Sequence, residues 1–259
     1  MKKALNIFIW VLLAAMLVAG LGYAWKEQEK IQVNEMRIRI NHEGSEALIS
    51  EKEVESVIKK VHKKPIGMKA GKVNVKEIES ALGRNPFIAD ANVFVNLDGI
   101  MSVDVMQRIP LARLQNKTGN QAFVDLNGNI FPLSQGHSAR VLVISGHIDI
   151  PLQTGYNVFN ASDSLRSYNS LHTACLIALE IYHHPGLSAM IGQIYMDEKG
   201  DAELFTITTN HTIVFGDESN ASDKFARLWL FYKRALPANG WNTYRIINLK
   251  FENQVVCTK

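Results

Sequence analysis

Two short motifs in the sequence contain the residue types of a serine transpeptidase. Ser56 precedes Lys59 by three residues, and residues 117–119 read Lys-Thr-Gly. Penicillin-binding enzymes use these elements, with the serine as nucleophile. Here, however, the residues between Ser56 and Lys59 belong to the apolar stripe of an ordinary helix, no Ser-x-Asn element lies between the two motifs, and the triplet falls in a polar loop. We therefore expect neither motif to be catalytic.

The other candidate sites are weaker. The segment 67–72 has two glycines and a lysine, but a phosphate-binding loop needs one more residue between the glycines and a Ser or Thr after the lysine. His183 and His184 have no partner at metal-ligand spacing, and His147 with Asp149 is read as a solvated pair. The two cysteines, Cys175 and Cys257, lie on apolar faces and are too few for a thiolate zinc site. The sequence predicts no catalytic residues, no metal, no cofactor and no small-molecule substrate.

Composition narrows the class of protein further. The 259 residues include 28 Lys or Arg against 25 Asp or Glu, a net charge of +3. This charge is too small and too dispersed for nucleic-acid binding, which needs clustered basic residues. The hydrophobic fraction of 47% is that of a chain able to form a buried core.

The N-terminal segment predicts a membrane anchor. Residues 4–24 are apolar except for Asn6, about the 20 residues that a spanning helix needs. Lys2 and Lys3 precede the run, which places the N-terminus in the cytoplasm. We expect a cytoplasmic tail at 1–3, a transmembrane helix at 4–25 and the remainder outside. A cleaved signal peptide, with a small-x-small pattern at residues 22–24, and a buried core helix are the alternatives.

The next segment predicts a small α+β unit. We expect a strand at 31–40, a helix opened by a capping box of Ser50 and Glu53, and a helix from Asn74 to Gly83. A hairpin follows, with alternating residues from Phe87 to Val105 around the Asp-Gly turn at 98–99. The order is strand, helix, helix, strand, strand, with both helices able to cover one sheet face.

Beyond Pro110 the pattern predicts a mixed, mostly antiparallel β domain with covering helices. Strand signals occur at 123–133, with a turn at Asn127-Gly128, at 140–144 and at 191–215. One helix is expected at 164–182, with Leu165, Tyr168, Cys175, Leu179 and Tyr182 buried. Another is expected at 222–236, with Phe225, Leu228, Trp229 and Tyr232 buried. Pro185 and Pro237 are expected just beyond the ends of these helices.

The last segment reads as one long strand. Ile247, Leu249, Phe251, Val255 and Cys257 alternate with polar residues, which indicates one buried and one wet face. We interpret it as an exposed edge to which a partner strand can add. The predicted partner-binding residues are Tyr244, Ile246, Asn248, Leu249, Lys250, Phe251, Glu252, Asn253, Gln254 and Val256.

The order of these elements resembles the bacterial cell-division family FtsQ/DivIB over nearly the whole chain. The segment 85–91 (Asn-Pro-Phe-Ile-Ala-Asp-Ala) resembles the entry into the second strand of that family's POTRA domain. Residues 109–112 resemble its x-Pro-x-Ala junction. Residues 123–131 resemble its Val-Asp-x-x-Gly-x-x-Phe hairpin, and residues 141–146 its strand ending in glycine.

This resemblance implies a non-enzymatic scaffold that links early and late septal proteins. It implies a POTRA domain at 31–108, an FtsQ-type β domain at 109–259 and a single-pass inner-membrane protein at the division septum. It also implies binding to FtsB-like and FtsL-like bitopic proteins, other divisome proteins at the POTRA domain, and a partner contact nearest Lys250 and Phe251.

Two other functional classes remain open from the residues alone. An anchored envelope enzyme acting on peptidoglycan would need a cluster of catalytic groups. A POTRA-bearing outer-membrane assembly factor would need successive membrane strands of roughly ten residues, whereas only soluble hairpins follow Pro110.

Overall fold

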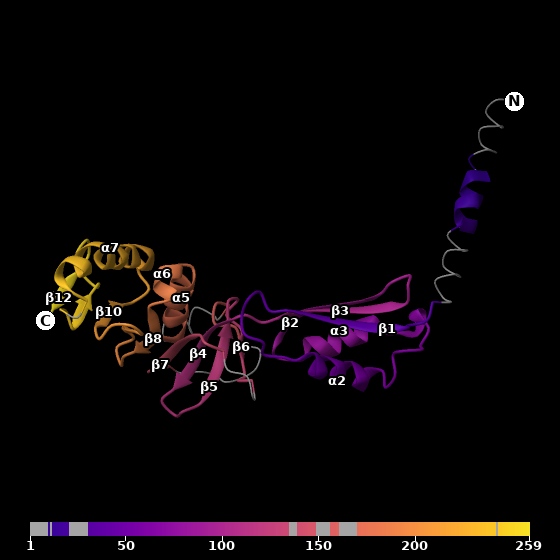
Figure 1. The fold of residues 1–259 in the computed structure, drawn as a ribbon, viewed down its shortest axis with the longest axis horizontal. Coiled ribbons are helices and arrows are strands. Elements are labelled where there is room, and N and C mark those ends of the chain that lie inside the picture. The colour runs from indigo at the N-terminus through magenta and orange to yellow at the C-terminus, as the bar shows by residue number, and fades with distance from the viewer. Residues whose placement is uncertain are drawn as a thin grey trace. The chain divides into compact units, whose positions relative to one another are not determined.

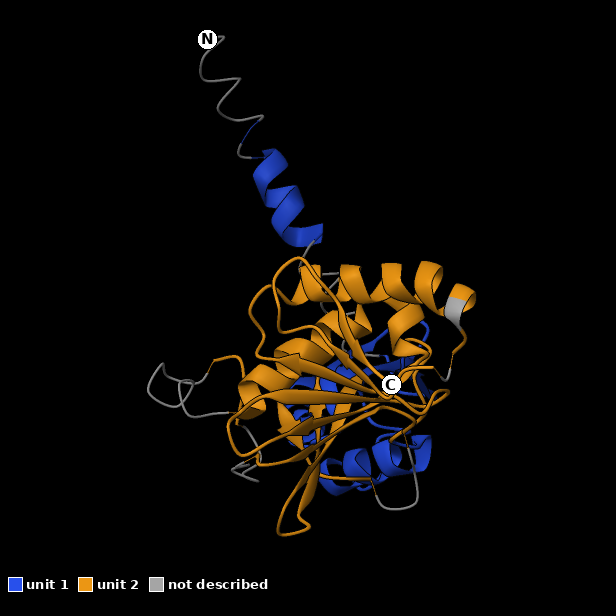
Figure 2. Cartoon of the chain, turned by 90° about the vertical axis from the view of Figure 1, so that its left-hand side faces the viewer, with its two compact units in different colours: residues 1–42, 49–107 blue, residues 43–48, 108–259 orange. Residues whose placement is uncertain are grey.

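The protein is described by a computed structural model covering residues 10, 12–20, 31–134, 139–148, 156–160, 170–241 and 243–259. The chain forms two compact units, unit 1 (residues 1–42 and 49–107) and unit 2 (residues 43–48 and 108–259) (Figure 2). Of the predicted anchor at 4–25, only residues 10 and 12–20 are described, and they are helical. Within the described residues, no helix has the length and apolar character needed to cross a membrane.

Unit 1 has the predicted order of elements. It contains β1 (Glu35–Asn41), α2 (Glu51–Val61), the short η1 (Ala70–Lys72), α3 (Val75–Gly83), β2 (Ile88–Val95) and β3 (Ile100–Gln107). The sheet order is β1-β3-β2, with β1 parallel and β2 antiparallel to β3. Both helices lie on the same side of the three strands (Figure 1).

Local signals explain the two helices of unit 1. Ser50 and Glu53 form the predicted capping box, in which the Ser50 hydroxyl accepts from the Glu53 N–H and the Glu53 carboxylate accepts from the Ser50 N–H. At α3 the Asn74 side-chain oxygen accepts from the Glu77 N–H and so caps the helix. Spacings of three and four residues then direct the apolar side chains of both helices toward the sheet, where Val54, Ile58, Ile78 and Leu82 are buried.

One edge of the unit 1 sheet is capped by a side chain. The main-chain N–H of Val93 in β2 donates to Oε1 of Glu79 in α3, at 2.9 Å. This N–H points away from β3, so the carboxylate takes the place that a neighbouring strand would occupy. The β2 edge is thereby made less available for strand pairing.

Unit 2 is built on one nine-stranded sheet. Its strands are β4 (Pro110–Asn116), β5 (Gln121–Asp125), β6 (Ile130–Phe131), β7 (Leu142–Gly146), β8 (Ile191–Met196), β9 (Ala202–Thr206), β10 (Thr212–Gly216), β11 (Ile246–Asn248) and β12 (Val256–Thr258). They lie in the order β12-β11-β10-β9-β8-β7-β4-β5-β6. The pairs β4–β7, β7–β8 and β10–β11 are parallel, and the other pairs in this sheet are antiparallel.

Helices α5 (Ser170–Tyr182), α6 (Pro185–Ser188) and α7 (Ala221–Asn239) lie on one side of this sheet (Figure 2). A single core fills the space between them and the strands. From α5 it takes Ala174, Cys175 and Ile177, from α7 Phe225, Leu228 and Tyr232, and from the strands Leu114, Ile144, Ile194, Leu204, Ile213 and Ile247. The burial of these apolar side chains supplies the main favourable term in the folding of unit 2.

Several sequence-based expectations for unit 2 are wrong in detail. Tyr182 is exposed, because α5 ends there and the chain turns into α6. Pro185 begins α6, where its missing N–H costs nothing. Pro237 lies inside the last turns of α7 rather than beyond them. Trp229 is only partly buried, and Leu165 and Tyr168 lie outside the described residues.

The turn between β5 and β6 is organised by a buried carboxylate. Asp125 is 3% exposed, and its side chain accepts from the N–H groups of Asn127 and Asn129 at 2.9 and 2.8 Å. The Arg108 guanidinium donates to its other oxygen at 2.7 Å. These donors compensate the charge and fix the Asn127-Gly128 turn that the sequence predicts.

Candidate partner-binding site

The C-terminal segment is not the single long strand that alternation predicts. β11 ends at Asn248, the chain reverses through residues 249–255, and β12 returns antiparallel, pairing Ile247 with Cys257 and Asn248 with Val256. We call residues 249–255 the terminal loop. Phe251, expected on the buried face, is 49% exposed. The alternating pattern therefore belongs to a hairpin and not to one strand.

Local geometry favours the reversal. The Asn248 side chain accepts from the Lys250 N–H at 2.9 Å, which turns the chain immediately after β11. Asn253 adopts a left-handed conformation with φ of 56°, which asparagine tolerates better than most residues. Ile247 and Leu249 are buried, and Val255 and Cys257 are partly buried against the core, so only Phe251 departs from the predicted inward row.

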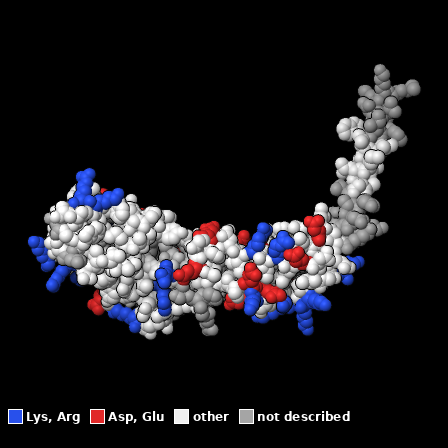
Figure 3. Space-filling view, in the orientation of Figure 1, with Lys and Arg blue, Asp and Glu red and all other residues white. Residues whose placement is uncertain are grey.

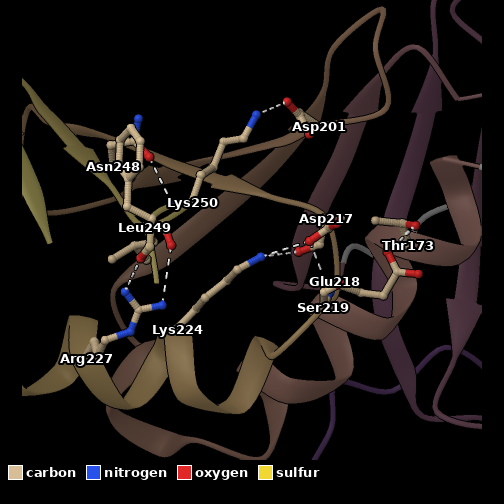
Figure 4. Close-up of polar contacts among 11 residues, drawn as sticks. Thr173, Asp201, Asp217, Glu218, Ser219, Lys224, Arg227, Asn248, Leu249 and Lys250 are labelled. Carbon is tan, nitrogen blue, oxygen red and sulfur yellow. Dashed lines mark hydrogen bonds and ion pairs between the residues drawn. The ribbon is translucent and has the colours of Figure 1, made fainter. Parts of the chain in front are cut away.

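A side chain from α7 binds the main chain of the terminal loop. The Arg227 guanidinium donates to the main-chain carbonyls of Phe251 (2.8 Å), Gln254 (2.6 Å) and Leu249 (3.4 Å), and Figure 4 shows the contact with Leu249. Its Nε atom donates to Asp223, one helical turn earlier, at 2.9 Å. The loop carbonyls that lack strand partners thus find their donors on one side chain.

A second basic residue fastens the loop to the sheet. The Lys250 ammonium pairs with Asp201 at the start of β9, as Figure 4 shows. This hydrogen bond raises the pKa of Lys250, which stays charged. Its aliphatic stem lies over Gly216, where a Cβ would come within 3.0 Å of the Lys250 Cγ. Lys250, a predicted partner contact, is therefore engaged within the free chain.

A third basic residue stabilises the start of α7. The Lys224 ammonium, which is largely buried, donates to the Asp217 carboxylate and main-chain carbonyl at 3.0 and 2.9 Å (Figure 4). This contact lowers the pKa of Asp217. It joins α7 to the end of β10, which keeps the helix that carries Arg227 next to the strands that support the terminal loop.

The ten predicted residues lie together on the hairpin but are not equivalent. Leu249 is buried, Tyr244 and Asn248 are half-buried, and the Tyr244 ring packs on Phe231. The exposed members are Ile246, Lys250, Phe251, Glu252, Asn253, Gln254 and Val256. Sequence reasoning missed Arg227, Asp201 and Gly216, because nothing in their spacing connects them with the last strands.

The two edges of the nine-stranded sheet differ. Residues 156–158 run beside β6, where the Ile130 N–H donates to the Tyr156 carbonyl and the Val158 N–H donates to the Gly128 carbonyl. In the part of the chain that the structure describes, nothing pairs with the outer side of β12. Among the described residues, the sheet therefore ends on this side at the three-residue β12, and not at the long strand that the sequence predicts.

The hydrogen-bond pattern shows which main-chain groups point outward. On β11, the Arg245 carbonyl and the Leu249 N–H bond to β10, so Ile247 between them also faces β10. Asn248 then faces β12, where it is paired with Val256, and the Thr258 carbonyl accepts from the Arg245 N–H. Because successive strand residues alternate, Cys257 directs its N–H and C=O to the open side.

The candidate catalytic residues do not form a catalytic site. Ser56 is exposed on α2, and Lys59 pairs with Glu55 at 2.8 Å. Lys117 contacts the His147 ring, whose Nε2 lies 3.2 Å from a Glu198 carboxylate oxygen. These three side chains bring three loops together, and none of them is a hydroxyl or thiol nucleophile.

His184 and Cys175, two of the weaker candidates, take part in local structure. His184 caps α6 by accepting from the Leu187 N–H, and its ring packs edge-on against Trp229. Burial raises the pKa of the Cys175 thiol to about 12, which makes it a poor nucleophile. Among the described residues, no three His, Cys, Asp or Glu side chains are placed to hold a metal ion.

Charged side chains do not gather into one basic surface on the face drawn in Figure 3. On the face drawn in Figure 3, acidic and basic side chains are interspersed over unit 1, and basic side chains stand singly or in small groups over unit 2. The small net charge is therefore not concentrated into one basic surface on this face.

Comparison with protein families identifies both units. Residues 109–258 match the family described as FtsQ/DivIB, C-terminal related, and residues 32–106 match a POTRA-like domain. A comparison with curated proteins found no match. Members of the family are generally non-enzymatic scaffolds of cell division, and the two matched domains support that role here, whereas an envelope enzyme is not favoured. The match covers more than half of the chain, which therefore belongs to the FtsQ/DivIB family.

Proposed function

We propose that the chain links early and late septal proteins by binding FtsB-like and FtsL-like bitopic partners at the hairpin of β11 and β12. The partner adds a strand to the outer side of β12 and contacts the terminal loop. The proposed contact residues are Tyr244, Ile246, Asn248, Leu249, Lys250, Phe251, Glu252, Asn253, Gln254 and Val256. Of these, Leu249 acts from the core, by holding the hairpin in place.

The difference between the two sheet edges carries this proposal. The edge at β6 is occupied by residues 156–158, while β12 leaves a main-chain donor and acceptor unpaired at Cys257 among the described residues. Strand addition uses such groups for affinity and neighbouring side chains for specificity. Phe251, Val256 and Ile246 are 49%, 40% and 40% exposed, and they give this edge an apolar contact surface.

The proposed placement in the cell follows from the N-terminal sequence. We propose a cytoplasmic tail at 1–3, a transmembrane helix at 4–25, a POTRA domain at 31–108 and an FtsQ-type domain at 109–259. The protein would be a single-pass inner-membrane protein at the division septum, with its bulk outside the cytoplasm. This arrangement places both domains where extracytoplasmic segments of other bitopic division proteins can reach them.

Two experiments test the proposal. Depletion of the protein should give filamentous, undivided cells, and normal division would contradict the scaffold role. For the site, full-length protein should retain the FtsB-like protein of the same bacterium in a pull-down, and Phe251→Ala should weaken retention. Because Phe251 is half exposed, its replacement should leave the amount of folded protein unchanged. A mutated, folded protein that binds as the wild type does would exclude the terminal loop.

Topology is tested separately. A reporter that is active only outside the cytoplasm, fused after Lys259, should be active in intact cells, and the mature protein should retain its N-terminal residues. A soluble form that begins near Trp25 would show that the apolar segment is a cleaved signal peptide. A partner at the POTRA domain is a further possibility of the family resemblance, and crosslinking from unit 1 would test it.

A further inference from the structure

The carbonyl groups of the terminal loop require a donor that the loop itself does not supply. Leu249, Phe251 and Gln254 direct their main-chain carbonyls toward a single point above α7. Carbonyls are acceptors only, so converging carbonyls cannot satisfy one another and are brought together only by a shared donor. The Arg227 guanidinium occupies that point.

Arg227 suits this position because of its geometry and its support. A guanidinium presents five N–H donors in a rigid fork, whereas a lysine ammonium is a compact point charge on a flexible stem. Asp223, one helical turn earlier, accepts only from Nε at 2.9 Å, which leaves both terminal nitrogens for the loop carbonyls. The helix beneath is fixed by buried Phe225 and Leu228 on either side of Arg227 in sequence. The donor is therefore presented by a rigid element.

The edge strand depends on this anchor. β12 has only three residues paired to β11, and it follows directly after the terminal loop. So short a strand has few ladder bonds of its own. The loop contacts of Arg227 therefore contribute to the position of the outward-pointing groups of Cys257. The Arg227 side chain is only 16% exposed, so it is poorly placed to contact a partner itself.

We propose that Arg227 is a positioning residue, which holds the terminal loop and β12 in the conformation that accepts the partner strand. This inference rests on the proposed function. It predicts that loss of the guanidinium fork lowers the fraction of molecules whose β12 edge is in the conformation that accepts the partner strand, which we call a competent edge. Affinity should then fall through slower association, because fewer encounters meet a competent edge, while the dissociation rate of the formed complex changes little.

The test uses the full-length chain in detergent with Arg227→Lys, which keeps the charge but loses the fork, and Arg227→Gln. Asp223→Ala is the matched control, because it removes the ion pair and leaves the three carbonyl contacts. Hydrogen–deuterium exchange is followed in peptides covering 246–259. Peptides covering β4 and β5 report in the same sample whether unit 2 stays folded. Association and dissociation rates are measured with the purified extracytoplasmic segment of the FtsB-like protein.

Both Arg227 variants should raise exchange at 249–258 about tenfold and slow association by a similar factor, with the dissociation rate within about twofold of wild type. The Asp223 variant should stay close to wild type in both measurements. Phe251→Ala gives the opposite pattern, a faster dissociation with unchanged exchange, because its side chain is exposed for direct contact.

Each other result decides against a stated part of the inference. Unchanged exchange at 249–258 overturns the anchoring role of Arg227. Raised exchange at β4 and β5 as well shows a purely structural role and overturns positioning. Raised local exchange with unchanged association overturns its importance for binding. If the wild type itself does not bind the probe, the proposed partner is wrong, and the exchange data alone then decide whether Arg227 holds the loop.

Discussion

Proline at two adjacent positions of β12 tests whether a partner strand adds to this edge. Val256 is paired with Asn248 and directs its N–H into the hairpin, whereas Cys257 directs its N–H outward. Proline has no N–H, and it is tolerated on an edge strand only where that group points away from the sheet. Val256→Pro should therefore damage the hairpin, and Cys257→Pro should damage only the added ladder.

The structure sets the expected magnitudes. Val256→Pro removes one ladder bond and leaves an acceptor on β11 unpaired, which should lower the free energy of unfolding by about 1–3 kcal/mol. Cys257→Pro removes no bond inside the chain, so we expect a change below ~1 kcal/mol. In the complex, the Cys257 variant loses a donor to the partner strand, which should weaken binding about 5–150-fold.

The assay combines urea unfolding of the full-length protein with binding to the FtsB-like protein. Cys257→Ala is the control for the half-buried side chain, since it keeps the N–H. Wild-type affinity in a folded Cys257→Pro variant would refute strand addition at β12. Equal destabilisation by both prolines would show that the outward direction of the Cys257 N–H is wrong.

Three further predictions follow from the described contacts. Burial lowers the pKa of His211 below its ordinary value, so the folded chain binds fewer protons than the unfolded chain. The free energy of unfolding should therefore fall as the pH falls below about 6.5. Urea titrations at pH 7.5 and 5.5 should show a smaller loss of stability for His211→Asn than for wild type. Asp125→Ala leaves the buried donors of the β5–β6 turn without their acceptor and should destabilise unit 2 by about 3–5 kcal/mol. Glu55→Gln breaks an exposed ion pair and should cost below ~1 kcal/mol in the same unfolding assay. Ser56→Ala combined with Lys117→Ala should support normal division, as measured by cell length, and filamentous cells with abundant folded protein would reopen the transpeptidase hypothesis.

Local sequence signals predicted most of unit 1. These signals act between residues three or four apart, so they are recognised without knowledge of the fold. They are the capping box of Ser50 and Glu53, the Asn74 cap and the turn at Asp98-Gly99. The sequence did not reveal that β1 pairs with β3 rather than β2, because strand order depends on contacts some 65 residues apart. It also did not reveal the Glu79 carboxylate on the β2 edge.

Less of unit 2 was predicted from the sequence, because its strand order also depends on contacts between distant residues. The hairpin at β5 and β6 was predicted from its Asn-Gly turn, but β4 was missed as a strand, and its parallel pairing with β7 joins segments about 30 residues apart. A strand that lies between two others, as β4 does, is recognised by the strands with which it pairs. Its own sequence gives only a short apolar run, which a buried helix segment can also show.

The amino-acid sequence by itself determined the class of protein: an ordinary charge, a small α+β unit followed by a strand-rich unit, and motifs in the order of the family. Only the tertiary structure decided the form of the candidate site. An alternation of period two is the same for one long strand and for two short strands joined by a loop, so residues 244–256 fit both readings. Beside the local turn at Asn248 and Asn253, the loop is held by Arg227, more than 20 residues earlier, whose guanidinium donates to the loop carbonyls.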